Sequence, residues 1–139
     1  MTGPASSGPA SSGPGLAGAA LVGFVATTDL ARAEAFYRDV LCLRHTETSP
    51  YACVFDANGT MLRVTLVPER AAAGYTVLGW WVGDIAATVA DLASRGVVFH
   101  RYDGMSQDES GVWTTPDGAR VAWFGDPDGN TLSLTQPPG

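Results

Sequence analysis

The sequence contains no lysine, and its eight arginines face fourteen aspartates and glutamates, which gives a formal net charge of −6. Only 16% of the residues are charged, and no run of basic residues occurs. Binding to a nucleic-acid backbone or an anionic membrane surface normally needs a basic patch. We therefore expect neither a nucleic-acid partner nor a membrane partner.

The chain is also poor in cysteine. Cys42 and Cys53 are too few for a disulfide framework and lack CxxC spacing, which favours a reducing compartment. The apolar run at 16–25 has no basic residue before it and is too short to span a bilayer, which takes roughly 20 residues. We therefore expect a cytoplasmic protein.

What the chain has in abundance near its start is Gly, Pro, Ala and Ser. The pentapeptide Gly-Pro-Ala-Ser-Ser at 3–7 recurs at 8–12 and begins again at Gly13. Such a repeat buries no apolar area that would offset the entropy of ordering it. We expect residues 1–18 to be a disordered tail and residues 19–139 to form one domain.

An internal repeat defines the organisation of that domain. The segment 22–45 aligns without a gap on 77–100, so that Asp29 corresponds to Asp84 (84 − 29 = 55). The turn at 56–59 aligns on 126–129 with an offset of 70, which predicts 15 extra residues (70 − 55) near 102–111. Each copy reads as a strand, a helix capped by its aspartate, and three short strands. The sequence therefore predicts an α+β fold of two tandem βαβββ modules, at 20–68 and 75–137.

Two motifs carry a resemblance to a known family. The segment Asp-Leu-Ala-Arg-Ala-Glu-Ala-Phe-Tyr-Arg-Asp-Val-Leu at 29–41 and the turn Asp-Pro-Asp-Gly-Asn at 126–130 resemble those of the vicinal oxygen chelate superfamily. That group includes glyoxalase I, ring-cleaving dioxygenases, epimerases and bleomycin resistance proteins. The resemblance implies a half-open mixed sheet around a cleft, and single-chain members with two modules commonly form homodimers. The helical stripe around Phe36 and Tyr37 is expected to offer apolar surface for such a dimer.

The resemblance also specifies where metal ligands would stand. Family enzymes typically place a histidine seven residues before each capping aspartate and a glutamate on the last strand of each module. Those positions here hold Val22, Val77, Arg63 and Ser133. Because valine, serine and arginine do not bind divalent metals in such sites, we expect no metal and no other cofactor.

The two histidines, His45 and His100, occupy equivalent positions in the repeat. One interpretation is a symmetric pair that binds a metal or acts as acid and base. The other is that each ends a strand half exposed and has no chemical role. The sequence leaves both open.

Strand alternation predicts which side chains line the cleft. The expected ligand-binding residues are Phe24, Arg63, Trp81, Trp123 and Ser133. Aromatic walls, a hydroxyl and one cation suit a planar or hydrophobic organic ligand with an anionic or carbonyl group. Arg63 has a competing interpretation as a structural ion pair with Asp56, Glu69 or another acid at the rim of the cleft.

Three functions remain open at this point. The first is a metal-independent small-molecule binding protein, such as one that sequesters an antibiotic. The second is a lyase, epimerase or dioxygenase of the same superfamily with an unplaced metal or acid/base pair. The third is a non-catalytic partner module.

Overall fold

The computed structural model describes residues 13–71 and 74–139. Module one contains strand β1 (Val22–Thr27), helix α1 (Leu30–Ala35), the π-helical turn η1 (Phe36–Val40) and strands β2 (Arg44–Thr48), β3 (Ala52–Ala57) and β4 (Thr60–Leu66). Most of the tail expected at residues 1–18 lies outside the described residues; the part that is described, 13–18, forms exposed turns and bends.

Module two repeats this order. It contains strand β5 (Thr76–Trp81), helix α2 (Ile85–Ser94) and strands β6 (Trp113–Thr114), β7 (Arg120–Gly125) and β8 (Thr131–Gln136). The predicted βαβββ units are confirmed.

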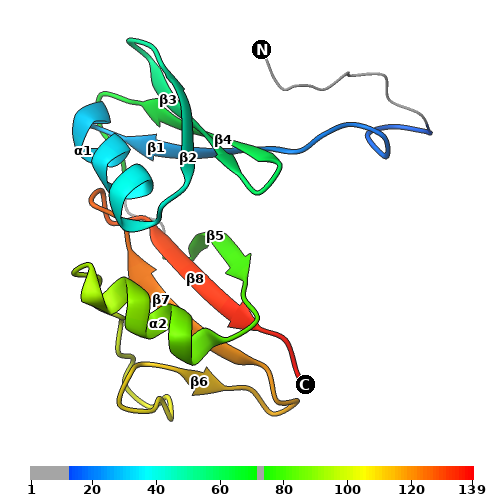
Figure 1. The fold of residues 1–139 in the computed structure, drawn as a ribbon, viewed down its shortest axis with the longest axis vertical. Helices are drawn as coiled ribbons and strands as arrows, with labels where there is room; N and C mark the ends of the chain where they lie inside the picture. The colour runs from blue at the N-terminus through cyan, green and yellow to red at the C-terminus, as the bar shows by residue number, and fades with distance from the viewer. Residues whose placement is uncertain (1–12, 72–73) are drawn as a thin grey trace.

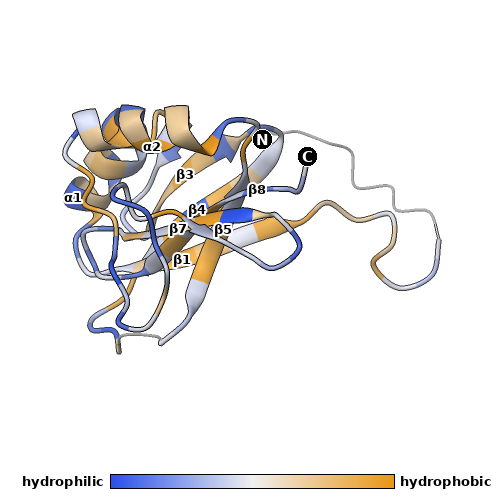
Figure 2. Ribbon diagram, turned by 90° about the horizontal axis from the view of Figure 1, so that it is seen from below, coloured by the Kyte–Doolittle hydropathy of each residue, from blue (hydrophilic) through white to orange (hydrophobic). Residues whose placement is uncertain are grey.

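Each module forms a four-stranded mixed sheet, in the order β1-β4-β3-β2 and β5-β8-β7-β6. The outer pairs β1–β4 and β5–β8 are parallel, and the remaining pairs are antiparallel. The two sheets lie one beyond the other along the molecule (Figure 1), and both helices lie on the same side of them (Figure 2). Each sheet therefore has a helix-covered face and an opposite face, which we call its open face.

The local signals explain these elements. Asp29 and Asp84 cap the two helices, because their side chains accept hydrogen bonds from the backbone amides of Arg32 (3.1 Å) and Ala87 (3.0 Å). Asn58 and Gly59 adopt φ angles of 51° and 96°, so they form the tight left-handed turn that the Asn-Gly pair predicts between β3 and β4.

The modules differ most where the sequence predicts an insertion. In module one, β2 connects to β3 through residues 49–51. In module two, two separate pieces pair with β7 where β2 pairs with β3 in module one. One is an isolated pairing of Phe99 with Phe124, and the other is β6. Residues 101–112 connect these two pieces as a loop, so the predicted insertion is confirmed.

Tyr37 corrects one sequence-based expectation. Phe36 and Tyr37 were expected to offer apolar surface for dimerisation, but Tyr37 is fully buried. Its hydroxyl donates a 2.7 Å hydrogen bond to the Asp126 carboxylate of module two. Burial, and then the neighbouring Asp126 charge, raise the pKa of this phenol far above its usual range. Tyr37 therefore joins the modules of one chain.

The β7–β8 turn provides further polar contacts between the modules. The Asp126 carboxylate also accepts from the backbone amides of Asp128 and Asn130 and from the Asn130 side chain, which in turn donates to the carbonyl of Ala26. The turn is thus fixed from inside and attached to β1.

Asp128 makes the second attachment. Its carboxylate accepts from the hydroxyl of Thr27 (2.6 Å), from the amide of Thr28 (3.0 Å) and from Arg32 (2.8 Å). Burial works to raise the pKa of Asp128, but these hydrogen bonds and the Arg32 charge outweigh it and lower the pKa. The carboxylate therefore stays ionised and holds the start of α1 against module two.

Candidate functional site

The open face of module one's sheet carries an apolar strand beside a cation. Phe24 on β1 is 64% exposed and lies in register with Arg63 on β4, whereas the next residue, Val25, is buried beneath the helix. The alternation predicted for β1 is therefore confirmed.

Arg63 has neither of the structural partners that the sequence suggested. Asp56 instead lies 3.5 Å from Arg44, and Glu69 forms no ion pair in the part of the chain that the structure describes. Within that part the Arg63 side chain makes no ion pair or hydrogen bond, although it is half-buried. A half-buried guanidinium without a protein anion is suited to receive one from a ligand.

The open face of module two's sheet is arranged in rows across the strands. One row contains Gly79, Ser133 and Trp123, and the neighbouring row contains Trp81, Thr135, Val121 and Trp113. Trp123 and Ser133 are direct partners in the pairing of β7 with β8. The small residues form a floor between the indoles, and a Cβ at Gly79 would lie 2.8 Å from the Ser133 hydroxyl as it is placed.

A hollow of about 230 Å³ lies on this face beside Trp81, lined by Gly79, Trp80, Trp81 and Thr135. The Trp81 side chain is 75% exposed, which is unusual for so large an apolar group. Such a hollow accommodates one or two fused rings.

Sequence reasoning missed two aromatic residues of this face. The Trp113 and Trp123 rings are stacked with centroids 6.3 Å apart, and the Tyr102 ring meets Trp123 edge-on at 5.5 Å. Trp113 was foreseeable, because the turn at 116–118 pairs it with Val121 on the same face. Tyr102 was not, because it lies in the insertion and has no counterpart in module one.

The five residues predicted to bind ligand thus fall into two groups. Phe24 and Arg63 belong to module one's sheet, and Trp81, Trp123 and Ser133 belong to module two's. No strand pairing joins the two sheets within 13–71 and 74–139. The structure places every one of these residues on an open face but does not bring the two groups into contact.

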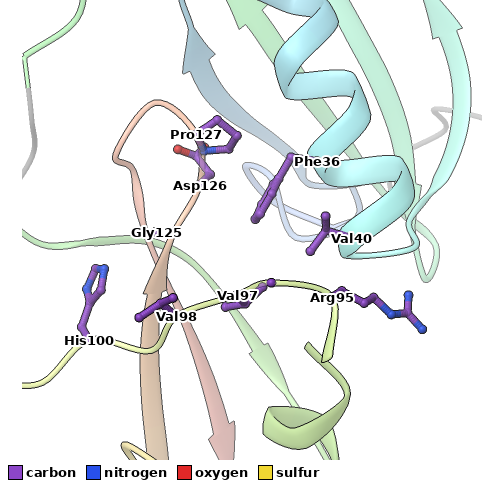
Figure 3. Close-up of a pocket in the computed structure, with 10 residues that line it drawn as sticks. Phe36, Val40, Arg95, Val97, Val98, His100, Gly125, Asp126 and Pro127 are labelled. Atoms are coloured by element: carbon purple, nitrogen blue, oxygen red, sulfur yellow. The ribbon is translucent and has the colours of Figure 1, made fainter. Parts of the chain in front are cut away.

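A larger groove of about 460 Å³ lies at the boundary between the modules, between η1 and the segment 95–100 (Figure 3). Phe36 and Val40 face Val97 and Val98 across it, with Arg95 and His100 at its ends. The Asp126 carboxylate at its edge is already satisfied by four donors. The groove is therefore an apolar seam between the modules with no free polar group at its centre.

The four positions expected for metal ligands do not fit a metal. Val22 and Val77 have no donor atom, Arg63 is a cation, and Ser133 points its hydroxyl over Gly79. Across the described ranges no group of three His, Cys, Asp or Glu residues could hold a metal ion. We therefore derive no chemistry through a metal.

The histidines are equivalent in sequence but not in surroundings. His45 packs on Phe55 beneath the helix, with its Nε2 atom 2.6 Å from the Thr48 hydroxyl and 3.6 Å from Glu34. The Nδ1 atom of His100 lies 3.1 Å from the Tyr102 hydroxyl on the opposite side of its sheet. The structure therefore does not assemble them as a symmetric pair.

Cys53 lies in the core and is fully buried. Burial, and to a lesser extent the nearby Glu34, raise the pKa of its thiol to about 11. A thiol that stays protonated at neutral pH is no nucleophile.

The family model described as Glyoxalase/Bleomycin resistance protein/Dioxygenase superfamily matches residues 19–134 of this chain. No curated protein matches the chain in sequence. None of the described helices has the length and apolar character needed to cross a membrane.

Solved structures share the fold at low identity. Lactoylglutathione lyase from Agrobacterium tumefaciens is 19% identical with a TM-score of 0.65, covering 84% of this chain and 92% of that one. TioX from Micromonospora sp. ML1 is 21% identical with a TM-score of 0.65, covering 86% and 98%. TnmS3, an antibiotic binding protein from Streptomyces sp. CB03234, is 23% identical with a TM-score of 0.63, covering 85% and 94%. At this identity the likeness shows the fold alone.

Proposed function

The chain belongs to the glyoxalase/bleomycin resistance protein/dioxygenase superfamily, and we propose that it is a metal-independent protein that binds an aromatic organic ligand. The observation that carries the proposal is the pair of open faces. On one, the exposed Phe24 lies beside Arg63, whose side chain has no ion pair among the described residues; on the other, the exposed Trp81 lies beside a hollow. Phe24, Arg63, Trp81, Trp123 and Ser133 are the binding residues in this proposal. Sequestration of an antibiotic is one form of it, supported by the fold shared with TnmS3.

The competing function is an enzyme of the same superfamily. A lyase or epimerase needs a metal or a base poised over the substrate. His100 is the candidate base beside the aromatic side chains of the open faces, but its Nδ1 atom already lies 3.1 Å from the Tyr102 hydroxyl. A binding protein is therefore better supported than an enzyme.

The test is a fluorescence titration of the four tryptophans with aromatic acids, run with and without a chelator. We expect saturable quenching that a chelator leaves unchanged, together with less than a stoichiometric amount of zinc, iron, manganese or nickel by elemental analysis. One metal ion per chain, or binding abolished by the chelator, would favour the enzyme.

We further propose that the protein is a homodimer, and that a second copy completes the cleft. Phe24 and Trp81 are exposed on β1 and β5, and both strands are edges of their sheets. An exposed apolar edge strand is a ready surface for another chain. A second copy would supply the facing wall that each open face lacks.

Light scattering at micromolar concentration should report a dimer. Trp81→Glu should shift the chain to monomer, because it places a charge in the apolar contact. Tyr51→Glu, at an equally exposed aromatic on the β2–β3 connection, is the matched control and should remain dimeric. A monomer of the unaltered protein well above this concentration would contradict the proposal.

A further inference from the structure

The open face of module two's sheet has a polar end. There the imidazole of His100 lies over Gly125, whose missing side chain provides the space, since a Cβ would stand 3.4 Å from the His100 Nε2 atom. The Nδ1 atom of the same ring lies 3.1 Å from the hydroxyl of Tyr102. The two side chains form one polar pair, with donor and acceptor capacity that depends on the histidine tautomer.

This polar pair is continuous with aromatic surface. The Tyr102 ring meets Trp123 edge-on, and Trp123 stacks on Trp113. We call Tyr102, Trp113 and Trp123 the aromatic wall. Gly79 and Ser133 lie beside the wall as a floor, so a flat molecule resting against the indoles reaches the polar pair at one end.

The loop that carries Tyr102 is held firmly. The Gln107 side chain accepts from the amide of Tyr102 and donates to the carbonyls of His100 and Gly111. The Asp108 carboxylate accepts from the amides of Ser110 and Val112. Hydrogen bonds within the loop thus fix Tyr102 before any ligand arrives, which lowers the entropic cost of binding.

The internal repeat indicates that this loop is not needed for the fold. Module one makes the same strands with the three connecting residues 49–51. The insertion therefore adds the Tyr102 hydroxyl and its ring to one open face only. Tyr102 is 40% exposed, so its hydroxyl is not a core group that merely had to be satisfied.

We propose that His100 and Tyr102 form a subsite for a phenolic hydroxyl, with the ring of that phenol lying along the aromatic wall. The inference rests on the proposed function and specifies its ligand class: a planar aromatic that carries a hydroxyl. A phenol donates one hydrogen bond and accepts another, so it matches a histidine nitrogen and a tyrosine hydroxyl together. The distance from β5 across β8 to β7 is two strand spacings, about 10 Å, so this part of the face is wide enough for a bicyclic ligand.

Equilibrium dialysis with 2-naphthol and 2-methoxynaphthalene tests the subsite, since the two probes share a ring system and differ in the hydroxyl proton. The unaltered protein should bind 2-naphthol about three- to tenfold more tightly, the range for one or two neutral hydrogen bonds. Tyr102→Phe keeps the ring and should remove most of that preference. Tyr51→Phe deletes an exposed hydroxyl in module one and should leave the preference unchanged.

Each other outcome has a distinct meaning. Equal binding of both probes, or a preference that survives Tyr102→Phe, overturns the subsite and leaves the proposed function standing. Binding of neither probe overturns both. If Tyr102→Phe and Trp113→Phe weaken the dimer by light scattering without changing probe binding, the wall is an interface between copies and the subsite is wrong.

Discussion

Replacing Asp126 by alanine should destabilise the fold by about 3–5 kcal/mol, the largest effect we expect from a single side chain. The Asp126 carboxylate is 8% exposed and accepts from Tyr37, from the Asn130 side chain and from two backbone amides. Its removal leaves a buried phenol and two amides without an acceptor and loosens the contact between the modules. The melting temperature should fall by about 10–20 °C.

The internal repeat supplies a matched control. Asp56 is the equivalent residue of module one, but it is partly exposed, and in the described part of the chain it accepts from the Gly59 amide and from Arg44. Asp56→Ala should cost about 1 kcal/mol or less. Tyr37→Phe, which removes one of the donors to Asp126, should cost an intermediate amount. Equal losses for Asp126→Ala and Asp56→Ala would contradict the role given to Asp126.

The fold could be predicted because the same sequence signals occur in both modules. Each signal of one module (the capping aspartate, the apolar strand and the turn before the last strand) has a partner at a fixed offset in the other. Strand β8, for example, begins at Thr131, directly after the turn at 126–130. Short-range signals of this kind determine the elements and the register of neighbouring strands.

The contacts between the modules could not be predicted in the same way. Tyr37 reads as one apolar residue of a helical stripe, and its hydrogen-bond partner Asp126 is 89 residues away. Asp126 itself reads as an ordinary turn residue. Nothing in either local pattern says that the two meet, because their meeting depends on how one module is placed on the other.

The candidate site was predicted only where alternation on regular strands applies. Phe24, Arg63 and Ser133 lie on the open faces as expected because each is on a strand with regular register. Tyr102 was not predicted, because a loop has no regular periodicity from which the direction of its side chains follows. The equivalence of His45 and His100 was misleading for the same reason, since the insertion begins directly after His100.

Arg63→Met should weaken binding of an aromatic acid by about 1.5–3 kcal/mol, the range for a hydrogen bond to a charged group. The methionine keeps most of the side-chain volume, so the strand packing against Phe24 and Val54 should survive. Because Arg63 makes no ion pair with any described residue, its loss should change the melting temperature little.

Arg44→Met is the matched control, because Arg44 is an exposed arginine of the same sheet that already has an acidic neighbour in Asp56. It should bind the acid as tightly as the unaltered protein does. The neutral ester of the same acid adds a second comparison, since Arg63→Met should reduce the difference between acid and ester. Two results would show that Arg63 is structural: a sharp fall in melting temperature at unchanged affinity per folded molecule, or no preference for the acid in the unaltered protein.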